Sequence, residues 1–286
     1  MQTMHRFYLP PESRTGDALR IEGREALHAL HVLRVKCGES VVVLDGAGHE
    51  FLCEIAEASR DAVTLRVRQK NSIPPPSCQI TLWQAVPKGK IIEAIIQKSV
   101  ELGAHRIVPL LTERVVTHLD EKERTHKREK WQWVAIEAIK QCGAAWLPEI
   151  ETPKTIEEAL SRRSAGLRPG SSNLQHAESA PGSSPSAFSL QLSAFDLSLV
   201  GSLQTERRHP RECFQEFQAK HGHPPQSVAV WIGPEGDFTP DEFKAIQASG
   251  ALPISLGRLT LRVETAAIYC LSILNYELNS RLEPKI

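Results

Sequence analysis

One stretch of the sequence, residues 228–276, constrains the fold more than any other part of the chain. Residues 228–232 form a short apolar run that is rich in β-branched side chains, and residues 252–256 form a second short run. Each run ends at a glycine, Gly233 in the first case and Gly257 in the second. Short apolar runs bounded in this way are typical of buried strands in a parallel sheet.

Helical patterns separate and follow these two predicted strands. Thr239 has the position of an N-cap, with Pro240 next and Glu242 three residues on, which is the capping-box start of a helix. Gly250 ends this helix, and from residue 263 to 278 apolar side chains recur at helical spacing. The stretch therefore predicts two strands whose glycine loops lie at their carboxyl ends, where α/β sheets bind ligands.

The spacing of the glycines alone does not identify a ligand. Neither loop has the G-x-G-x-x-G pattern of dinucleotide-binding folds or the G-x-x-x-x-G-K-[ST] pattern of P-loops. On spacing alone, both loops are ordinary strand-to-helix turns in which glycine lets the backbone approach a neighbour closely.

The identities of the residues in this stretch resemble those of one family. Residues 232–243 read IGPEGDFTPDEF, and residues 255–266 read SLGRLTLRVETA. In this order and at this distance, the two motifs are similar to the C-terminal signature of the RsmE family, the 16S ribosomal RNA uracil-N3 methyltransferases of the SPOUT superfamily. Two positions depart from the family pattern, since Asp237 replaces a second glycine and Leu259 replaces an arginine.

The resemblance implies a fold class and a set of site residues. The implied fold is α/β, with a C-terminal SPOUT-type, trefoil-knotted methyltransferase domain and an N-terminal PUA-like β-barrel. In this family the loops of the knot hold S-adenosylmethionine in a bent shape, and a homodimer completes the site. The implied catalytic residues are Arg262 and Glu264. The implied cofactor-binding residues are Val200, Gly201, Ile232, Gly233, Pro234, Glu235, Gly236, Ser255, Leu256, Gly257, Leu259, Leu261 and Arg262.

Composition bounds the class of protein. The 286 residues are enough for two modest domains, and 34 basic against 34 acidic side chains argue against a protein that coats nucleic acid by bulk charge. The six cysteines are scattered without a C-x-x-C pair, so we expect buried reduced thiols and no metal site. No apolar run reaches membrane length and no signal sequence opens the chain, so we expect a soluble, cytoplasmic protein that binds no membrane.

The sequence divides into two predicted domains. Residues 1–72 are rich in short β patterns, from which we expect a PUA-like RNA-binding β-barrel, and the Ile-Pro-Pro-Pro run at residues 73–76 is a stiff linker. Residues 77–286 alternate strands with helices and form the predicted methyltransferase domain. Residues 161–193 are dense in Ser, Gly and Pro with few large apolar side chains, and we expect a flexible insertion there.

Two clusters in the predicted barrel resemble the opening of the family. They contain Arg6 and Arg34, which we expect to pair with RNA phosphates. Phe7, beside Arg6, either stacks on a base or belongs to the core. His28 and His31 lack a third ligand at matching spacing, so they do not predict a metal site.

The second domain contributes further RNA-contact candidates, Lys88, Lys98 and Arg114, which lie in segments that match the family pattern. Two of them have a simpler alternative that the sequence leaves open. Lys98 has the position of a solvated helix residue, and Arg114 has the position of a surface ion-pair partner.

The predicted function is methyl transfer from S-adenosylmethionine to N3 of a uridine in the 16S RNA of the small ribosomal subunit, uracil 1498 being the family's target. Arg262 is expected to stabilise negative charge on the uracil, while Glu264 orients Arg262 or accepts the proton. One alternative is a ribose 2′-O-methyltransferase of the same superfamily, whose N-P-x-N-x-G motif is absent from the chain. The other is a non-catalytic RNA-binding assembly factor, a reading that the Leu259 departure supports.

Overall fold

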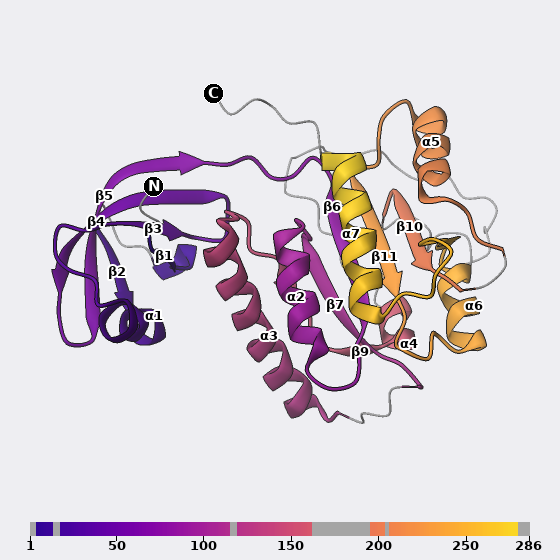
Figure 1. The fold of residues 1–286 in the computed structure, drawn as a ribbon, viewed down its shortest axis with the longest axis horizontal. Helices are drawn as coiled ribbons and strands as arrows, with labels where there is room; N and C mark the ends of the chain where they lie inside the picture. The colour runs from indigo at the N-terminus through magenta and orange to yellow at the C-terminus, as the bar shows by residue number, and fades with distance from the viewer. Residues whose placement is uncertain (1–3, 14–17, 115–118, 162–194, 204–205, 280–286) are drawn as a thin grey trace, which may run out of the picture.

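The computed structural model describes residues 4–13, 18–114, 119–161, 195–203 and 206–279. They form a five-stranded N-terminal sheet and a seven-stranded second sheet, with α3 running beside the N-terminal sheet (Figure 1). The predicted flexible insertion, residues 161–193, lies outside the described residues apart from Ser161, which ends a helix.

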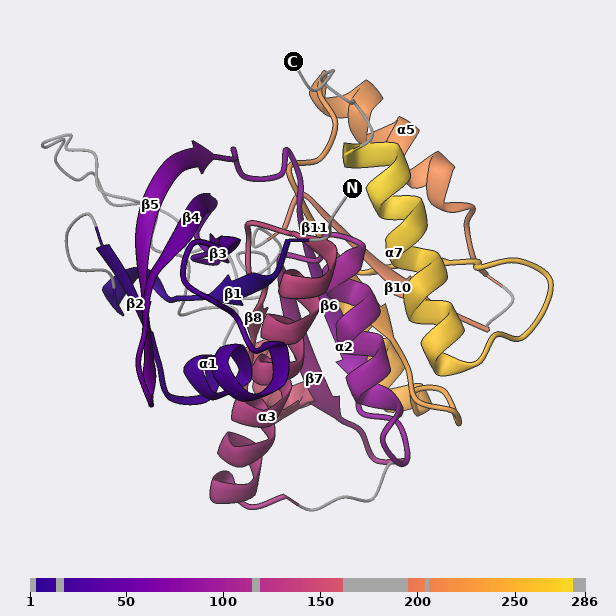
Figure 2. The ribbon, with the colours of Figure 1, turned by 60° about the vertical axis from the view of Figure 1, so that its left-hand side comes forward.

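The N-terminal sheet is curved around a core of its own (Figure 2). Its helical segments are α1 (Gly23–Leu27) and the π-helical η2 (His28–Leu33), and a short η1 (Pro11–Ser13) precedes them. Phe7 is buried in this core together with residues of α1 and η2, so the core interpretation of Phe7 is the correct one. The strands are β1 (Arg6–Tyr8), β2 (Ala18–Glu22), β3 (Ser40–Leu44), β4 (His49–Ala58) and β5 (Ala62–Ser72), in the order β1-β3-β4-β5-β2.

The barrel-like shape comes from bending and from the helical cover. β4 and β5 pair through register shifts near Cys53 and Glu57, and such irregularities increase the twist of a strand pair. In the described part of the chain, the edge strands β1 and β2 share no hydrogen-bonded ladder. The buried side chains of α1 and η2 therefore complete the core that the five strands enclose.

The second sheet is parallel throughout, as the alternation of strands and helices predicts. Its order is β12-β10-β11-β6-β7-β8, and β9 pairs with β7. The strands are β6 (Gln79–Ala85), β7 (Arg106–Leu111), β8 (Glu149–Ile150), β9 (Lys154–Thr155), β10 (Leu197–Gly201), β11 (Ser227–Ile232) and β12 (Leu252–Ile254). Thus β10 lies between the two strands that the C-terminal stretch predicts. The trefoil knot concerns how the chain threads through its own loops, and it stays a prediction.

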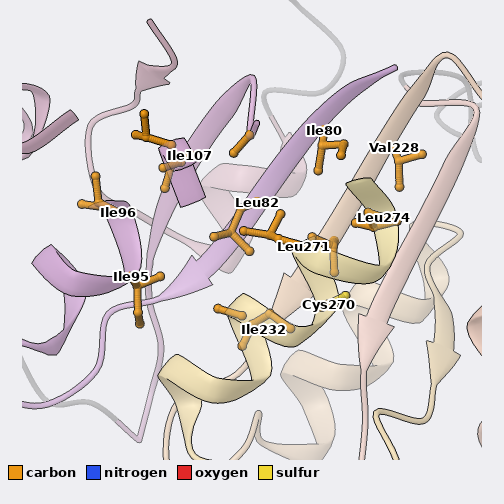
Figure 3. Packing of buried hydrophobic residues seen from close by; sticks show 14 of the residues in the cluster. Ile80, Leu82, Ile95, Ile96, Ile107, Val228, Ile232, Cys270, Leu271 and Leu274 are labelled. Atoms are coloured by element: carbon orange, nitrogen blue, oxygen red, sulfur yellow. The ribbon is translucent and has the colours of Figure 1, made fainter. Parts of the chain in front are cut away.

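Helices cover both faces of this sheet, which is why its strands are apolar on both sides. Ile80 and Leu82 of β6 pack under α2 and α7 (Figure 3). Trp83 points to the opposite face, where it stacks on Trp231 at 4.4 Å between ring centroids and joins Ile246 of α6. The helices are α2 (Ile91–Glu101), α3 (Glu121–Cys142), α4 (Ile156–Ser161), α5 (Pro210–His221), α6 (Pro240–Ala248) and α7 (Val263–Asn279).

Local capping sets where two of the helices begin. α5 begins at Pro210, because the side chain of His209 accepts a hydrogen bond from the N–H of Arg211 at 3.2 Å. α3 begins at a capping box formed by Asp120 and Glu123.

The two sheets are joined by direct contacts in addition to the linker. Arg6 of β1 donates to the carbonyl oxygens of Lys140 and Gln141, each at 3.3 Å, near the C-terminal end of α3. Those carbonyls lack partners within the helix, and a cation there complements the helix dipole. Trp146 Nε1 lies 3.1 Å from the carbonyl oxygens of Ile73 and Pro74, so the predicted stiff linker is held against the second domain.

Candidate active site

A cavity of about 440 Å³ opens at the carboxyl ends of β10, β11 and β12. Its volume falls within the range of roughly 300–1,000 Å³ that is typical of small-molecule sites. Two loops form most of its wall, the first glycine loop (residues 233–238) and the second glycine loop (residues 255–261), together with the start of α7. The predicted position of a ligand site, at the ends of parallel strands, therefore coincides with a real cavity.

The first glycine loop is a tight turn that leaves little room for side chains. The N–H of Asp237 donates to the carbonyl of Pro234 at 2.9 Å. A Cβ added to Gly233 would lie 3.0 Å from Asp237 Oδ1 and 3.3 Å from the ring of Phe238. Glycine at position 233 therefore permits the close return of the chain.

The departure at Asp237 has a structural explanation. Asp237 has a φ of 62°, in the left-handed region that the family's glycine adopts without steric cost. Aspartate is among the side chains that tolerate this region, because it hydrogen-bonds the nearby backbone. Here Asp237 Oδ1 accepts from the N–H of Phe238 at 2.8 Å. The substitution keeps the shape of the loop.

Two segments anchor the first glycine loop from outside. Glu235 Oε1 accepts from the backbone N–H of Lys88 at 3.1 Å, and the guanidinium of Arg114 donates to two carbonyl oxygens of the loop. At the start of α6, the predicted capping box is present between Thr239 and Glu242. Buried Glu242 also accepts from the N–H of Glu113 at 2.9 Å. The loop is thus tied to the segments that follow β6 and β7.

The second glycine loop lies against the end of β10. The N–H of Ser202 donates to the carbonyl of Ile254 at 3.1 Å. A Cβ on Gly201 would lie 3.3 Å from Ile232 Cδ1 and 3.4 Å from Leu256 Cδ1, so glycine permits this close crossing. Gly257 has a φ of 115°, a conformation that side chains disfavour, which explains the glycine of this motif.

Arg262 and Glu264 both line the cavity, at the junction of the second glycine loop and α7. Arg262 is exposed and Glu264 is partly exposed. No hydrogen bond or ion pair joins their side chains to each other or to another described residue. The predicted pairing of the two therefore stays a prediction, and both side chains are available to a ligand.

Most of the predicted cofactor-binding residues form the cavity wall, and three do not line it. Val200 is fully buried in the sheet, the Oγ of Ser255 is bonded to the backbone of Gly257 at 3.3 Å, and Gly236 is exposed beside the stem of Arg114. The predicted residues on the wall are Gly201, Ile232, Gly233, Pro234, Glu235, Leu256, Gly257, Leu259, Leu261 and Arg262.

Sequence reasoning missed several wall residues. Arg207 lies in an irregular segment before α5, where no motif marks it as a site residue, and its Nη1 donates to the carbonyl of Ser202 at 3.3 Å. Asp237 belongs to the quoted motif and was treated only as a departure. The wall residues that the prediction did not include are Ile91, Ser202, Leu203, Arg207, Asp237, Thr260, Val263 and Ala266.

The RNA-contact candidates of the N-terminal sheet have different surroundings. Arg6 is partly buried, and its guanidinium bonds the end of α3, so it joins the two sheets. Arg34 is exposed at the C-terminal end of η2, with a φ of 54°. Of the two, Arg34 has its guanidinium in solvent, and RNA contact by Arg34 stays a prediction.

The candidates of the second domain also separate. Lys98 Nζ lies 2.9 Å from the carboxylate of Glu101 on the same exposed helix face, as the simpler alternative proposed. Lys88 is exposed, and its backbone holds Glu235. Arg114 contacts the first glycine loop instead of an acidic partner, so the surface ion-pair interpretation of Arg114 is wrong.

The cysteine thiols do not line this cavity. All six cysteines are free, with Cys37 and Cys142 exposed and the other four buried. Burial raises the pKa of the Cys270 thiol to about 12. Among the described residues, no three His, Cys, Asp or Glu side chains are grouped so that they could hold a metal ion. The helices of the described ranges also include none with the length and apolar character needed to cross a bilayer.

Comparisons with known proteins agree with this geometry. Residues 74–275 match the family model of the RNA methyltransferase domain, and residues 21–68 match that of the RNA methyltransferase PUA domain. A ribosomal RNA small subunit methyltransferase E from Bacillus subtilis is 29% identical over 90% of this chain and 89% of its own. The protein of the same name from Synechocystis is 28% identical over 96% of this chain and 78% of its own.

Solved structures show the same fold. A Legionella pneumophila protein, solved in complex with the bound cofactor SAM, superposes with a TM-score of 0.76 at 28% identity, covering 96% of this chain and 98% of its own. A ribosomal RNA small subunit methyltransferase E from Neisseria gonorrhoeae, bound to S-adenosyl methionine, has a TM-score of 0.75 at 22% identity, covering 98% of this chain and all of its own. The α/β fold with an N-terminal PUA-like domain is therefore that of these methyltransferases. The chain therefore belongs to the RsmE family of RNA methyltransferases, and its relatives in that family are named ribosomal RNA small subunit methyltransferase E.

Proposed function

We propose that this RNA methyltransferase binds S-adenosylmethionine in the cavity between the two glycine loops and methylates N3 of one uridine in the 16S RNA of the small ribosomal subunit. The observation that carries the proposal is the cavity itself, whose wall combines both family motifs with Arg262 and Glu264. The similarity to relatives named for the small ribosomal subunit supports the choice of RNA.

The chemistry of the wall fits this cofactor. Leu256, Leu259 and Leu261 offer apolar surface for an adenine ring, and Gly201 leaves open a space that a Cβ would fill. The cofactor carries positive charges and one carboxylate, and the wall contains carboxylates as well as guanidinium groups. When bound, S-adenosylmethionine supplies an electrophilic methyl group. Holding it in line with the target nitrogen is a contribution of proximity and orientation.

The polar side chains at the cavity mouth are placed for the acceptor. N3 of uracil carries a proton, and its loss spreads negative charge over N3 and the two neighbouring carbonyl oxygens. Arg262 is always charged and presents a planar fork of donors, which suits that distribution of charge. Glu264 either orients this guanidinium or accepts the proton. A base that reaches such a cavity must first leave its stack in the RNA.

A homodimer and a cytoplasmic location complete the proposal. The outer face of α7 carries the exposed Tyr269 and Tyr276, 46% and 70% accessible, although the same helix packs its other face on the sheet. A second copy covering this face would bury aromatic surface beside the cavity, which α7 lines at its start. Light scattering at micromolar concentration tests this, and a monomeric mass would contradict it. The cytoplasm is where the proposed ribosomal RNA substrate lies.

The function is tested by mass spectrometry of nucleosides. Ribosomal RNA from cells that lack this protein is incubated with the purified chain and S-adenosylmethionine carrying an isotope-labelled methyl group. We expect labelled 3-methyluridine in 16S RNA. Labelled 2′-O-methyluridine would identify the ribose methyltransferase alternative, and RNA binding without any labelled nucleoside would identify the assembly factor.

A further inference from the structure

Arg114 lies in an unexpected place for a residue with an RNA-contact pattern. It follows β7, yet its guanidinium reaches the first glycine loop, more than a hundred residues away in the sequence. Nη1 donates to the carbonyl oxygen of Gly236 and lies 3.5 Å from that of Asp237. The aliphatic stem takes part as well, since a Cβ added to Gly236 would lie 3.2 Å from Arg114 Cδ.

These contacts fall on the part of the loop that is hardest to hold. Asp237 is one of only two non-glycine residues with positive φ among those described. A non-glycine residue in that region persists only where its surroundings impose it. The guanidinium of Arg114 holds the two carbonyl groups that flank the Cα of Asp237, those of Gly236 and Asp237 itself. The Oδ1 of Asp237 holds the next N–H, that of Phe238. Gly233, at the other end of this turn, lines the cavity.

The other anchors of the loop act elsewhere. Lys88 contributes only its backbone N–H, to the side chain of Glu235, and Glu242 holds the start of α6. Among the hydrogen bonds of the described residues, the guanidinium of Arg114 is the side-chain donor that reaches the loop's own carbonyl oxygens. A guanidinium is suited to this task because it remains charged and offers several donors in a fixed plane.

We propose that Arg114 is a positioning residue for the cofactor, whose guanidinium clasps the carbonyl oxygens of Gly236 and Asp237 and so keeps the first glycine loop in the shape that binds S-adenosylmethionine. The identity of the cofactor in this inference rests on the proposed function. Arg114 acts through the loop and does not contact RNA. A Cβ at Gly236 would meet the stem of Arg114 at 3.2 Å, so glycine permits the close approach of the arginine.

Cofactor affinity and amide hydrogen exchange in the loop test this contact of Arg114 with Gly236 and Asp237, called the clasp below, in two separate ways. S-adenosylmethionine is titrated into the full chain by calorimetry for wild type, Arg114→Ala and Arg114→Lys. Amide hydrogen exchange of Asp237 and Phe238 is measured on the same proteins without cofactor. We expect Arg114→Ala to weaken binding at least tenfold and to speed exchange at both amides. Arg114→Lys should recover only part of the affinity, because a lysine is a point charge without the planar fork.

A matched control and a coupling experiment separate positioning from general stability. Lys244→Ala removes one cation from the exposed face of α6, just beyond the same loop, and should leave both readouts unchanged. Gly236→Ala places a Cβ against the arginine stem, so it should weaken binding in the wild-type background and much less in the Arg114→Ala background. Equal effects of Gly236→Ala in both backgrounds would contradict the clasp.

The outcomes distinguish this inference from the proposed function. If wild type does not bind S-adenosylmethionine, the proposed function fails, while the exchange rates still report on the clasp. Unchanged exchange at Asp237 and Phe238 in Arg114→Ala overturns the inference whatever the cofactor. Wild-type cofactor affinity combined with a large loss of 16S RNA affinity in Arg114→Ala also overturns it, because Arg114 would then be an RNA contact. A fall in melting temperature that accounts for the whole loss of binding would assign Arg114 a merely structural role.

Discussion

Lys140 of α3 and Glu25 of α1 form a buried ion pair between the two sheets, with Lys140 Nζ 2.8 Å from Glu25 Oε1. Their side chains are only 6% and 9% exposed. The other carboxylate oxygen of Glu25 accepts from the N–H of Tyr8 at 3.2 Å, and Lys140 also contacts Glu137 at 2.9 Å. This network fixes the N-terminal sheet on the helix layer of the methyltransferase domain.

Breaking this pair should destabilise the protein strongly. Lys140→Met leaves the Glu25 carboxylate buried without its cation, which typically costs about 3–5 kcal/mol of unfolding free energy. The double variant Lys140→Met/Glu25→Gln should lose less than the sum of the two single losses. Urea denaturation gives these free energies. Lys98→Ala, which breaks an exposed pair, should cost at most about 1 kcal/mol. Equal losses for Lys140→Met and Lys98→Ala would contradict the importance of the buried pair.

Arg262→Ala should lose activity more than cofactor affinity. If its guanidinium stabilises charge mainly in the transition state, its removal lowers kcat with little effect on the ground state. Losing one such donor typically costs on the order of a hundredfold in rate. Single-turnover methylation of 16S RNA, alongside calorimetric titration of S-adenosylmethionine, measures both quantities. Turnover near that of wild type would end the catalytic role, and parallel losses of binding and turnover would make Arg262 a binding residue.

Glu264→Gln separates the two roles assigned to the carboxylate. A residue that only orients Arg262 should add nothing once Arg262 is gone, so the double variant should be no slower than the slower single variant. If Glu264 is instead the proton acceptor, Glu264→Gln should remove one pH-dependent step from the profile of turnover against pH. Rates measured across pH on wild type and Glu264→Gln decide between these outcomes. Identical pH profiles would contradict the role of proton acceptor, and additive losses in the double variant would contradict the orienting role.

Asp237→Ala should lower the free energy of unfolding more than Asp237→Gly does. Asp237→Ala puts a Cβ without a hydrogen-bonding group in the left-handed region and should cost about 1–2 kcal/mol. Asp237→Gly removes the strain but also the bond to Phe238, so its effect should stay within about 1 kcal/mol. Unfolding free energies of both variants check this order. A larger loss for glycine than for alanine would show that the side-chain bond outweighs the backbone strain.

His105 should make stability depend on pH. Burial, and next the charge of Arg106, lower the pKa of His105 below its usual value. The folded protein then binds fewer protons than the unfolded chain, so this contribution to stability is fully present above about pH 6.5 and is lost as pH falls through the folded-state pKa. His105→Gln should reduce the loss of unfolding free energy between neutral and mildly acidic pH, and the exposed His126→Gln should not. Equal pH dependence in wild type and His105→Gln would contradict this.

Local rules predicted many of the elements, because those rules depend on neighbours in the sequence, and the family resemblance supplied the predicted residues of the cavity wall. The capping box at Thr239 and the two glycine motifs are examples. Arg6 and Arg114 show where such rules end. Each resembles a solvent-facing cation in sequence, yet each bonds backbone carbonyls that lie more than a hundred residues away. Only the packing of the two sheets and the return of the C-terminal strands bring those carbonyls into reach.

The position of β10 has a consequence for how the protein is made. Its partners β11 and β12 both follow it along the chain, and the last wall of the cavity lies at residues 255–266. A nascent chain leaving the ribosome can fold its N-terminal sheet early, because that sheet has its own core. The cofactor cavity has no such intermediate form. It is complete only when nearly the whole polypeptide has been synthesised, so a product that ends before residue 255 keeps the N-terminal sheet but lacks one wall of the cavity.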